Sequence, residues 1–493
     1  MKTDQTTLLV LIFAIALGIR ALGIEARPIW YDEAFSLLIS QHNPTAILAG
    51  TLSADADTSA AEEHPPAYYF VLWGWMQTFG NSLISARALS ILAGLGIVLL
   101  IYLIAQHLFD QSTALSAGLF AAILPFQVHY AQEVRMYVFL ALWLCLATFA
   151  FLRKRWILFA MSAALAQYTH NLAAIYLIPL ALTPVFQKDW KTLRALTLAG
   201  FAAILIYSPW LIHLPAQLSK IQNSFWIEKP GAERLFTLLL YYVPNLPLPN
   251  DWLLPGLFLA ALTVTLAAYQ TCRALKHKLP DASHGLWLAY FSFAPPLLLW
   301  LISQIQPIYV ERALLPSHAM FCLWLAWALT KTRLPRPIQL TAFALVIASA
   351  AMGLYQHVTY NGFPYGPYAM LDKSLSERFQ TGDVIVHSSK LSYLPSIYFD
   401  RDLSQQFIAD PAGGATDTLS PATMQILSLN VAEDVESASE GASRVWFVIF
   451  TRAIDEYQAA GQPMHPHLAW LDEHYHLEEV KTWGDVQVYL FTR

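Results

Sequence analysis

The feature that most constrains this chain is its succession of apolar runs, each close to the length of a membrane crossing. A helix that spans the hydrocarbon core needs about 20 largely apolar residues. Eleven segments approach that length: Leu8–Ile24, Ala88–Ala105, Ala114–Tyr130, Tyr137–Leu152, Trp156–Tyr168, Leu172–Phe186, Ala195–Ile212, Trp252–Tyr269, Leu286–Ile302, Ala313–Leu329 and Ile338–Tyr355. Only 13% of the residues are charged, against roughly a quarter in soluble domains. We therefore predict a polytopic α-helical membrane protein.

A twelfth apolar stretch, Ala67–Phe79, decides the topology. It has 13 residues, which is short for a crossing. Four loops rich in basic residues, which favour the cytoplasmic side, contain Arg153, Lys154, Arg155, Lys188, Lys191, Arg194, Arg273, Lys276, Lys278, Lys331, Arg333 and Arg336. If Ala67–Phe79 lies on the membrane surface, all four loops share the side of the N-terminus. We predict a multi-pass protein of the cytoplasmic (inner) membrane with a cytoplasmic N-terminus and an extracytoplasmic C-terminal part.

This topology divides the chain into a membrane module, residues 1–355, and an extracytoplasmic domain, residues 356–493. The first outer loop then covers residues 25–87. About 135 residues follow Gln356, which is enough for a small domain. Short apolar runs within them, at Val384–Val386, Val445–Phe450 and Val486–Phe491, neighbour polar, partly helical sequence. We predict a small α/β domain. The net charge of −5 argues against nucleic-acid binding.

The first polar motif of the outer face is Trp30-Tyr31-Asp32-Glu33. Two adjacent carboxylates at a membrane surface are costly unless they are solvated or functional. Asp32 could accept the proton of an acceptor hydroxyl as a general base. The alternative is a solvated first turn of a helix, where Asp and Glu are favoured.

The second motif runs from Glu62 and Glu63 through His64 and two prolines to Tyr68 and Tyr69. Its aromatic residues suit a helix at the membrane surface, so an anchor is one interpretation. His64 and Glu63 could also help to hold a divalent metal, although structural metal sites usually have four ligands. A metal therefore stays an open alternative, and no other cofactor is expected.

Two further motifs place ionisable residues on the outer side. Glu133 and Arg135 lie in a tight turn at membrane depth, where such residues are functional candidates. Arg87 and Arg312 each open a span at the outer rim, and arginines there can hold a phosphate through paired N–H donors. The alternatives are a polar hairpin cap for the turn and arginines that extend to lipid headgroups.

In this order, the elements resemble the GT-C superfamily, specifically its bacterial branch related to protein O-mannosyltransferases and lipid A aminoarabinose transferases. The resemblance covers roughly residues 1–330. It is carried by Trp30 to Ser36, His64 to Tyr69, Phe79 and Gly80 with Arg87 to Ser90, Gln132 to Tyr137, and Arg312 to Pro316. Where the family usually has Tyr after the last arginine, this chain has Ala313.

The resemblance implies an inverting glycosyltransferase that uses a polyprenyl-phosphate sugar donor on the outer face of the membrane. Asp32 matches the catalytic acidic residue of the family's first outer loop, and Glu133 matches the acidic position of the second outer loop, often Asp in relatives. Glu33 and Glu133 would support catalysis. The expected substrate-binding residues are His64, Tyr68, Arg87, Arg135, Tyr137 and Arg312. The sugar stays open, and so does the choice of a lipid, glycan or protein acceptor.

Two other functions compete with this interpretation. A transporter or lipid flippase would place ionisable residues near the midplane of its helices, whereas here they gather at one face. A membrane receptor whose C-terminal domain does the binding is the second alternative. A phosphate-cradling Gly-rich loop is absent from the sequence, and this agrees better with a lipid-linked donor than with a nucleotide sugar.

Overall fold

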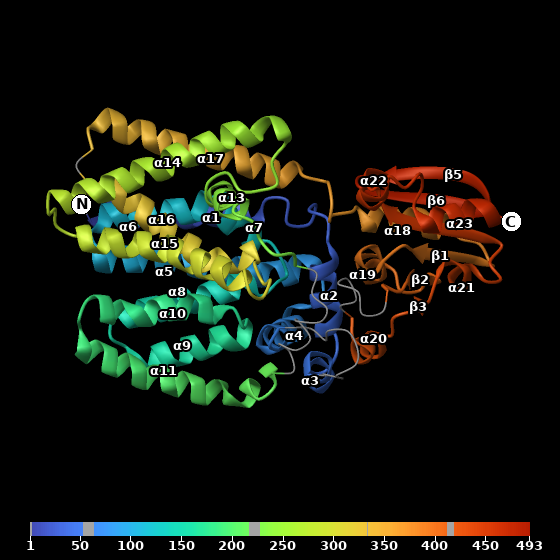
Figure 1. The fold of residues 1–493 in the computed structure, drawn as a ribbon, viewed down its shortest axis with the longest axis horizontal. Coiled ribbons are helices and arrows are strands. Elements are labelled where there is room, and N and C mark those ends of the chain that lie inside the picture. The colour runs from blue at the N-terminus through green and yellow to red at the C-terminus, as the bar shows by residue number, and fades with distance from the viewer. Residues whose placement is uncertain (1, 53–63, 216–226, 333, 412–418) are drawn as a thin grey trace.

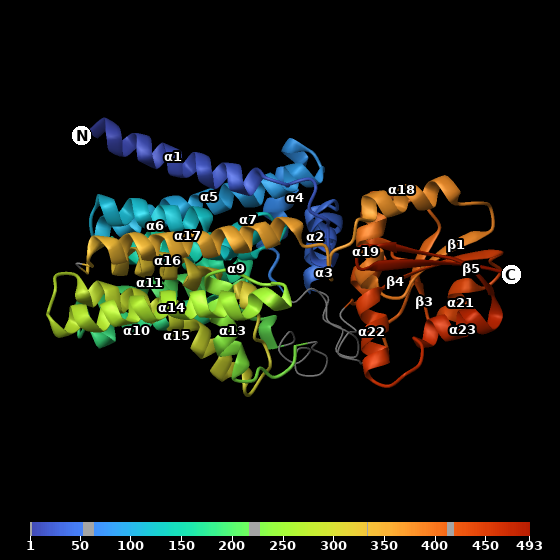
Figure 2. The ribbon, with the colours of Figure 1, turned by 90° about the horizontal axis from the view of Figure 1, so that it is seen from above.

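The computed structural model describes residues 2–52, 64–215, 227–332, 334–411 and 419–493. These residues form a long helical bundle and a separate α/β domain beyond one of its ends (Figure 1). The N-terminus lies at the end of the bundle opposite the C-terminal domain, as do the turns that join α10 to α11 and α14 to α15 (Figures 1 and 2). The residues Glu62, Glu63 and Arg333 fall outside the described ranges.

The bundle contains most of the apolar sequence. Its helices are α1 (Lys2–Ala21), α5 (Leu83–Leu108), α6 (Gln111–Ile123), α7 (Pro125–Ala131), α8 (Tyr137–Leu152), α9 (Trp156–Thr169), α10 (Ala173–Phe186), α11 (Trp190–Leu211), α13 (Glu233–Tyr242), α14 (Asn250–Lys276), α15 (Ala282–Ser303), η1 (Glu311–Leu314) with α16 (Leu315–Thr330), and α17 (Arg336–Thr359).

Within the described residues, six helices are long and apolar enough to cross a membrane: α5, α11, α14, α15, η1 with α16, and α17. Together, α6 and α7 also qualify, although they bend by 57° where Pro125, which has no N–H to donate, starts α7. The helices α1, α8, α9 and α10 are apolar but shorter. Every predicted crossing lies in one of these helices, so the chain is a polytopic helical protein, and the count of eleven crossings stays a prediction.

Three short helices lie between the bundle and the C-terminal domain (Figure 2). They are α2 (Tyr31–Ser40), α3 (Pro44–Leu52) and α4 (Ala67–Phe79). The third has the bounds expected for the non-spanning helix. Its inward side chains, among them Tyr68, Tyr69 and Met76, are buried. This layer carries Asp32 at the base of the C-terminal domain.

The C-terminal domain is built on a mixed six-stranded sheet in the order β3-β2-β1-β4-β6-β5. The strands are β1 (Asp383–His387), β2 (Gln405–Ile408), β3 (Val431–Ala432), β4 (Arg444–Phe450), β5 (His476–Trp483) and β6 (Val486–Thr492). From β3 to β4 the neighbours run parallel, and β6 is antiparallel to both β4 and β5. The three apolar runs noted in the sequence coincide with β1, β4 and β6.

Helices surround the sheet and join it to the bundle. They are α18 (Tyr368–Arg378), α19 (Lys390–Phe399), α20 (Pro421–Leu427), α21 (Val435–Ser439), α22 (Thr451–Ala459) and α23 (Pro466–His474). The α19 helix packs on α2, and α20 packs on α3. The hydroxyl of Thr423 donates to the carbonyl of Gly50 at 3.3 Å, and the Tyr398 hydroxyl donates to the carbonyl of Asn81 at 3.3 Å. The domain therefore packs on α2, α3 and the segment just before α5.

Candidate active site

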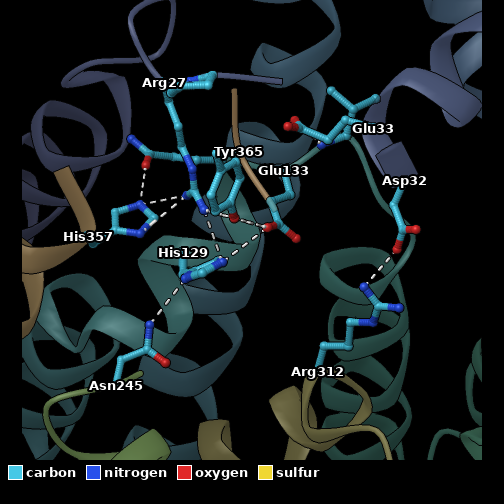
Figure 3. A network of polar contacts seen from close by, with 12 residues as sticks. Arg27, Asp32, Glu33, His129, Glu133, Asn245, Arg312, His357 and Tyr365 are labelled. Carbon is cyan, nitrogen blue, oxygen red and sulfur yellow. Dashed lines mark hydrogen bonds and ion pairs between the residues drawn. The ribbon is translucent and has the colours of Figure 1, made fainter. Parts of the chain in front are cut away.

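The two carboxylates of the first motif point to different sides of α2. Trp30 precedes the helix in an extended conformation, so Asp32 and Glu33 fall in its first turn. Adjacent helical residues are rotated by about 100° around the axis. As a result, Asp32 points toward Arg312, whereas Glu33 points away from it and is buried (Figure 3). Their surroundings give them different chemistry.

Asp32 forms an ion pair with an arginine that lies 280 residues further along the chain. Its Oδ2 accepts a hydrogen bond of 2.7 Å from Arg312, and its side chain is 13% exposed. The Arg312 guanidinium also lies over two rings, 5.4 Å from the centroid of Trp30 and 4.9 Å from that of Tyr137. These contacts hold a cation beside a carboxylate that solvent and substrate can reach.

A second arginine approaches Asp32 from the turn between α7 and α8. The Nε atom of Arg135 lies 3.5 Å from Asp32 Oδ2. The same guanidinium donates to the hydroxyl oxygens of Ser36 at 3.2 Å and of Tyr69 at 3.4 Å. Asp32 therefore lies between two guanidinium groups, whose N–H donors can also bind an anionic group such as a phosphate.

Glu33 and Arg87 form a separate, fully buried pair. Both side chains are 0% exposed, and the two carboxylate oxygens accept hydrogen bonds of 3.0 and 2.9 Å from Arg87. The backbone N–H of Val134 also donates to Glu33 at 3.0 Å. The remaining Arg87 nitrogen donates to the carbonyls of Ile24 and Arg27. This geometry revises the expectation that Arg87 holds the donor phosphate, because each of its nitrogens already has a protein acceptor.

Glu133 lies in the tight turn after α7, with only 2% of its surface exposed. One carboxylate oxygen accepts from His129 Nε2 at 3.0 Å and from the hydroxyl of Tyr365 at 3.2 Å. The other oxygen is buried without a hydrogen-bond partner among the described residues. Burial works to raise the pKa of Glu133, but His129, Arg27 and Arg312 outweigh it and lower that pKa to about 2. Glu133 is therefore an ionised carboxylate at neutral pH.

The other expected binding residues lie around Tyr137. The ring of His64 packs 4.4 Å from that of His170, and both lie near the Tyr137 ring. Burial, together with nearby Arg312 and Arg135, lowers the pKa of His170 to about 3. Tyr68 is buried, with Tyr69 and Phe139 as neighbours. His170 was not singled out from the sequence, where a lone histidine after a span carries little signal.

No group of three or more His, Cys, Asp or Glu side chains in the described ranges is placed to hold a metal. Glu63 lies outside these ranges, so a divalent metal at His64 and Glu63 stays an open alternative.

A network of polar side chains that sequence reasoning did not find lies behind Glu133 (Figure 3). Its members come from five different segments: Arg27, His129, Asn245, His357 and Tyr365. They line a cavity of about 300 Å³, its open mouth included. The one available signal was a basic residue in the outer segment after the first span.

Known proteins resemble this chain in sequence. The family model of dolichyl-phosphate-mannose-protein mannosyltransferases matches residues 63–213. The undecaprenyl phosphate-alpha-4-amino-4-deoxy-L-arabinose arabinosyl transferases of Pseudomonas paraeruginosa and Pseudomonas aeruginosa are each 28% identical over 287 residues, 52% of this chain. The chain spans about half the length of these curated relatives, since the match covers 50% of each.

Solved structures resemble it along nearly its whole length. ArnT from Cupriavidus metallidurans in the apo state superposes with a TM-score of 0.65 at 14% identity, covering 98% of both chains. The same protein bound to undecaprenyl phosphate gives 0.63 at 13% identity. The oligosaccharyltransferase of Archaeoglobus fulgidus gives 0.55 at 13% identity, covering 98% of this chain and 74% of the other. The chain has a GT-C fold.

In this GT-C fold, α2 and α4, the α7–α8 turn and the start of α16 meet at the end of the bundle that adjoins the C-terminal domain (Figure 1). Most of the expected residues meet there: Asp32, His64, Glu133, Arg135, Tyr137 and Arg312. Glu33 and Arg87 form the buried support behind them.

Proposed function

We propose that this protein is an inverting glycosyltransferase of the cytoplasmic membrane that takes a sugar from a polyprenyl-phosphate carrier on the outer face. The observation that carries the proposal is the partly exposed Asp32 carboxylate between Arg312 and Arg135, at 2.7 and 3.5 Å, in a GT-C fold. The name of the solved ArnT complex, which contains undecaprenyl phosphate, supports a lipid phosphate as the donor group.

In the proposed reaction, an acceptor hydroxyl attacks the anomeric carbon while Asp32 takes its proton. The bond between that carbon and the phosphate oxygen breaks, and its electron pair leaves on the polyprenyl phosphate. Attack from the face opposite the leaving group inverts the anomeric centre. Arg312 and Arg135 stabilise the negative charge that grows on the phosphate.

The ion pairs of Asp32 suggest how donor binding prepares the base. Arg312 and Arg135 both contact the same oxygen of Asp32. A phosphate that enters between the arginines offers oxygens with more charge than one carboxylate, so it competes for the same N–H donors. Each arginine that turns to the phosphate leaves Oδ2 of Asp32 free to accept the proton of the acceptor hydroxyl. The site thus gains its base when the donor is in place.

The remaining residues have supporting parts in this proposal. We assign His64, Tyr137 and Tyr68 to the sugar and acceptor region, next to the two arginines. Glu133 orients the acceptor or balances charge near the reacting carbon. Arg87 serves Glu33, as their buried pair indicates. The acceptor is a lipid, glycan or protein of the cell envelope, and no step requires a metal.

The experiment uses purified protein in lipid nanodiscs with undecaprenyl-phosphate sugars, and it measures released undecaprenyl phosphate. Asp32→Asn keeps the size of the side chain but cannot accept a proton at neutral pH. We expect its turnover to fall about 100- to 10,000-fold, while undecaprenyl phosphate still binds. Glu456→Gln is the matched control, because it neutralises an exposed carboxylate that pairs with Arg452 far from the site.

Two outcomes would contradict the proposal. If Asp32→Asn turns over as fast as the Glu456→Gln control, Asp32 is not the base. If the wild type transfers sugar from none of the polyprenyl-phosphate donors but moves a labelled lipid across the bilayer, the chain is the transporter or flippase that its many apolar helices would also allow. The arabinosyltransferase relatives and the ArnT-like fold favour the transferase.

A further inference from the structure

The network behind Glu133 has a direction that follows from its donors and acceptors. The amide nitrogen of Asn245 lies 3.2 Å from Nδ1 of His129, and Nε2 of the same ring lies 3.0 Å from Glu133. An amide N–H can only donate, so Nδ1 must accept and the ring proton sits on Nε2. The Nε2–H group of His129 therefore donates a hydrogen bond to the carboxylate of Glu133.

One neighbour competes for the same ring nitrogen. A terminal nitrogen of Arg27 lies 3.1 Å from His129 Nε2. Nε2 cannot accept from Arg27 and donate to Glu133 at the same time. The same Arg27 nitrogen has another acceptor in the hydroxyl of Tyr365, whereas the amide of Asn245 leaves Nδ1 only the accepting role. The donor on Asn245 therefore selects the tautomer that serves Glu133.

Asn245 is held in place by an unusual packing contact. It adopts a left-handed conformation with φ of 66°, which Asn tolerates better than most residues. The preceding Pro244 packs against α17 at Gly353, where a Cβ would lie 1.6 Å from the Pro244 carbonyl oxygen. Only glycine permits this approach, so the amide of Asn245 reaches His129 because α17 has no side chain at this point.

Tyr365 brings a second donor from the other side. It lies in the segment between α17 and α18, three residues before the C-terminal domain's first helix. Its hydroxyl accepts from Arg27 and donates to the same Glu133 oxygen as His129, at 3.2 Å. Burial raises the pKa of Tyr365, so the phenol keeps the proton that it donates.

From these contacts we propose that Asn245, His129 and Tyr365 are positioning residues that hold Glu133 by one oxygen and present its other oxygen to the reacting groups. The proposal rests on the transferase function proposed above, because it assigns a task to Glu133 in that reaction. Oε1 takes both donated hydrogen bonds, and the buried Oε2 has no partner among the described residues. The carboxylate thus has one anchored oxygen and one available to an acceptor hydroxyl.

A matched pair of substitutions at His129 tests the proposal. Gln places an N–H donor close to the position of Nε2, whereas Asn reaches only as far as Nδ1. We expect His129→Gln to keep kcat within about 3-fold of the wild type. His129→Asn should lower kcat about 10- to 100-fold, the effect of losing a hydrogen bond to a charged group. The KM for the donor should be unchanged in both variants.

If His129 only stabilises the fold and does not position Glu133, the two variants should show a different pattern of kcat. If both variants lose kcat equally, in proportion to their loss of thermal stability, the proposal is overturned. Tyr365→Phe gives a second comparison, since it removes one donor and keeps the ring against Trp30 and Tyr360. We expect about a 10-fold lower kcat, and an unchanged kcat would remove Tyr365 from the set.

A spectroscopic measurement separates this inference from the proposed function, because it needs no substrate. The infrared difference between a protein and its own Glu133→Gln derivative isolates the Glu133 carboxyl. The charged or titratable groups that interact with it, which stay the same in both position-129 variants, are Arg27, Arg312, Tyr68, Tyr130 and Tyr365.

At about pH 4, the infrared band of a protonated carboxylic acid should be absent from the wild type and from His129→Gln. As the pH is lowered, this band should appear in His129→Asn at a pH at least about one unit higher than in His129→Gln. Equal titration in the two variants overturns the positioning role, whether or not the wild type transfers sugar. If the wild type transfers no sugar but the infrared spectra are as expected, only the proposed function is refuted.

Discussion

The sharpest consequence of the structure concerns Glu33, which lies next to the proposed base but serves a different purpose. Its carboxylate and the Arg87 guanidinium are both fully buried and joined by two hydrogen bonds. Replacing Glu33 by Gln keeps the shape and removes the charge. Arg87 would then be a buried cation without a counterion, which typically costs about 3–5 kcal/mol.

That cost sets the size of the expected effect. The entropy of unfolding is about 2.1 cal/mol/K per residue, so 1 kcal/mol shifts the unfolding temperature of a helical module of about 355 residues by about 1.3 °C. We therefore expect the unfolding midpoint of Glu33→Gln in detergent to fall by about 4–7 °C. Glu456→Gln is the control, since it neutralises a carboxylate of an exposed ion pair. Its midpoint should move by less than about 2 °C.

A double-mutant cycle makes the test specific for the pair. Arg87→Met alone leaves Glu33 as the unpaired charge, whereas the double substitution removes both charges. We expect the double variant to be more stable than the sum of the two single losses predicts, with a coupling of about 1–3 kcal/mol. If Glu33→Gln instead unfolds with the wild type and has lost all transfer, Glu33 takes part in the chemistry and the reasoning from burial is refuted.

Three further predictions follow from other parts of the molecule. Arg312→Ala should weaken undecaprenyl phosphate binding about 10- to 100-fold in a direct binding assay, and unchanged affinity would make Arg312 a structural anchor. Burial raises the pKa of Asp372 to about 8, so the folded state holds a proton that the unfolded chain releases, and stability should fall as pH rises from about 4 to 8. Asp372→Asn should flatten that decline in thermal unfolding scans, and an unchanged slope would contradict the assignment. Gly353→Ala must displace the Pro244 backbone, so it should cost about 1–3 kcal/mol in stability and lower kcat in transfer assays, unless α17 shifts without moving Asn245.

Much of the architecture could be predicted from hydropathy and charge. Each apolar run of near-crossing length lies in a helix of the bundle, since lipid requires backbone polar groups to bond within their own segment. Ala67–Phe79 is a helix with the expected bounds because its two preceding prolines suit a helix start. The strands β1, β4 and β6 coincide with the apolar runs of the C-terminal part, because buried strands of a sheet read as continuous apolar stretches.

The motif Trp30 to Glu33 could be read as a site from sequence, but the separate roles of its two carboxylates could not. Both are acidic residues at a helix start, and local sequence does not say which side of α2 meets the buried Arg87. Neighbouring residues of a helix point in different directions, and α5 packs against the loop. As a result, Glu33 points into the interior, whereas Asp32 contacts Arg312.

The sequence by itself determined that this chain is a helical membrane protein whose polar motifs lie between its apolar runs, because hydropathy and charge act locally along the chain. Only the tertiary structure decided which polar groups meet. Arg27, His129 and Tyr365 come from segments more than 100 residues apart, and Asn245 reaches them through a loop that packs on Gly353. Such contacts depend on how helices pack and where loops return, and a linear pattern of residue types does not record that.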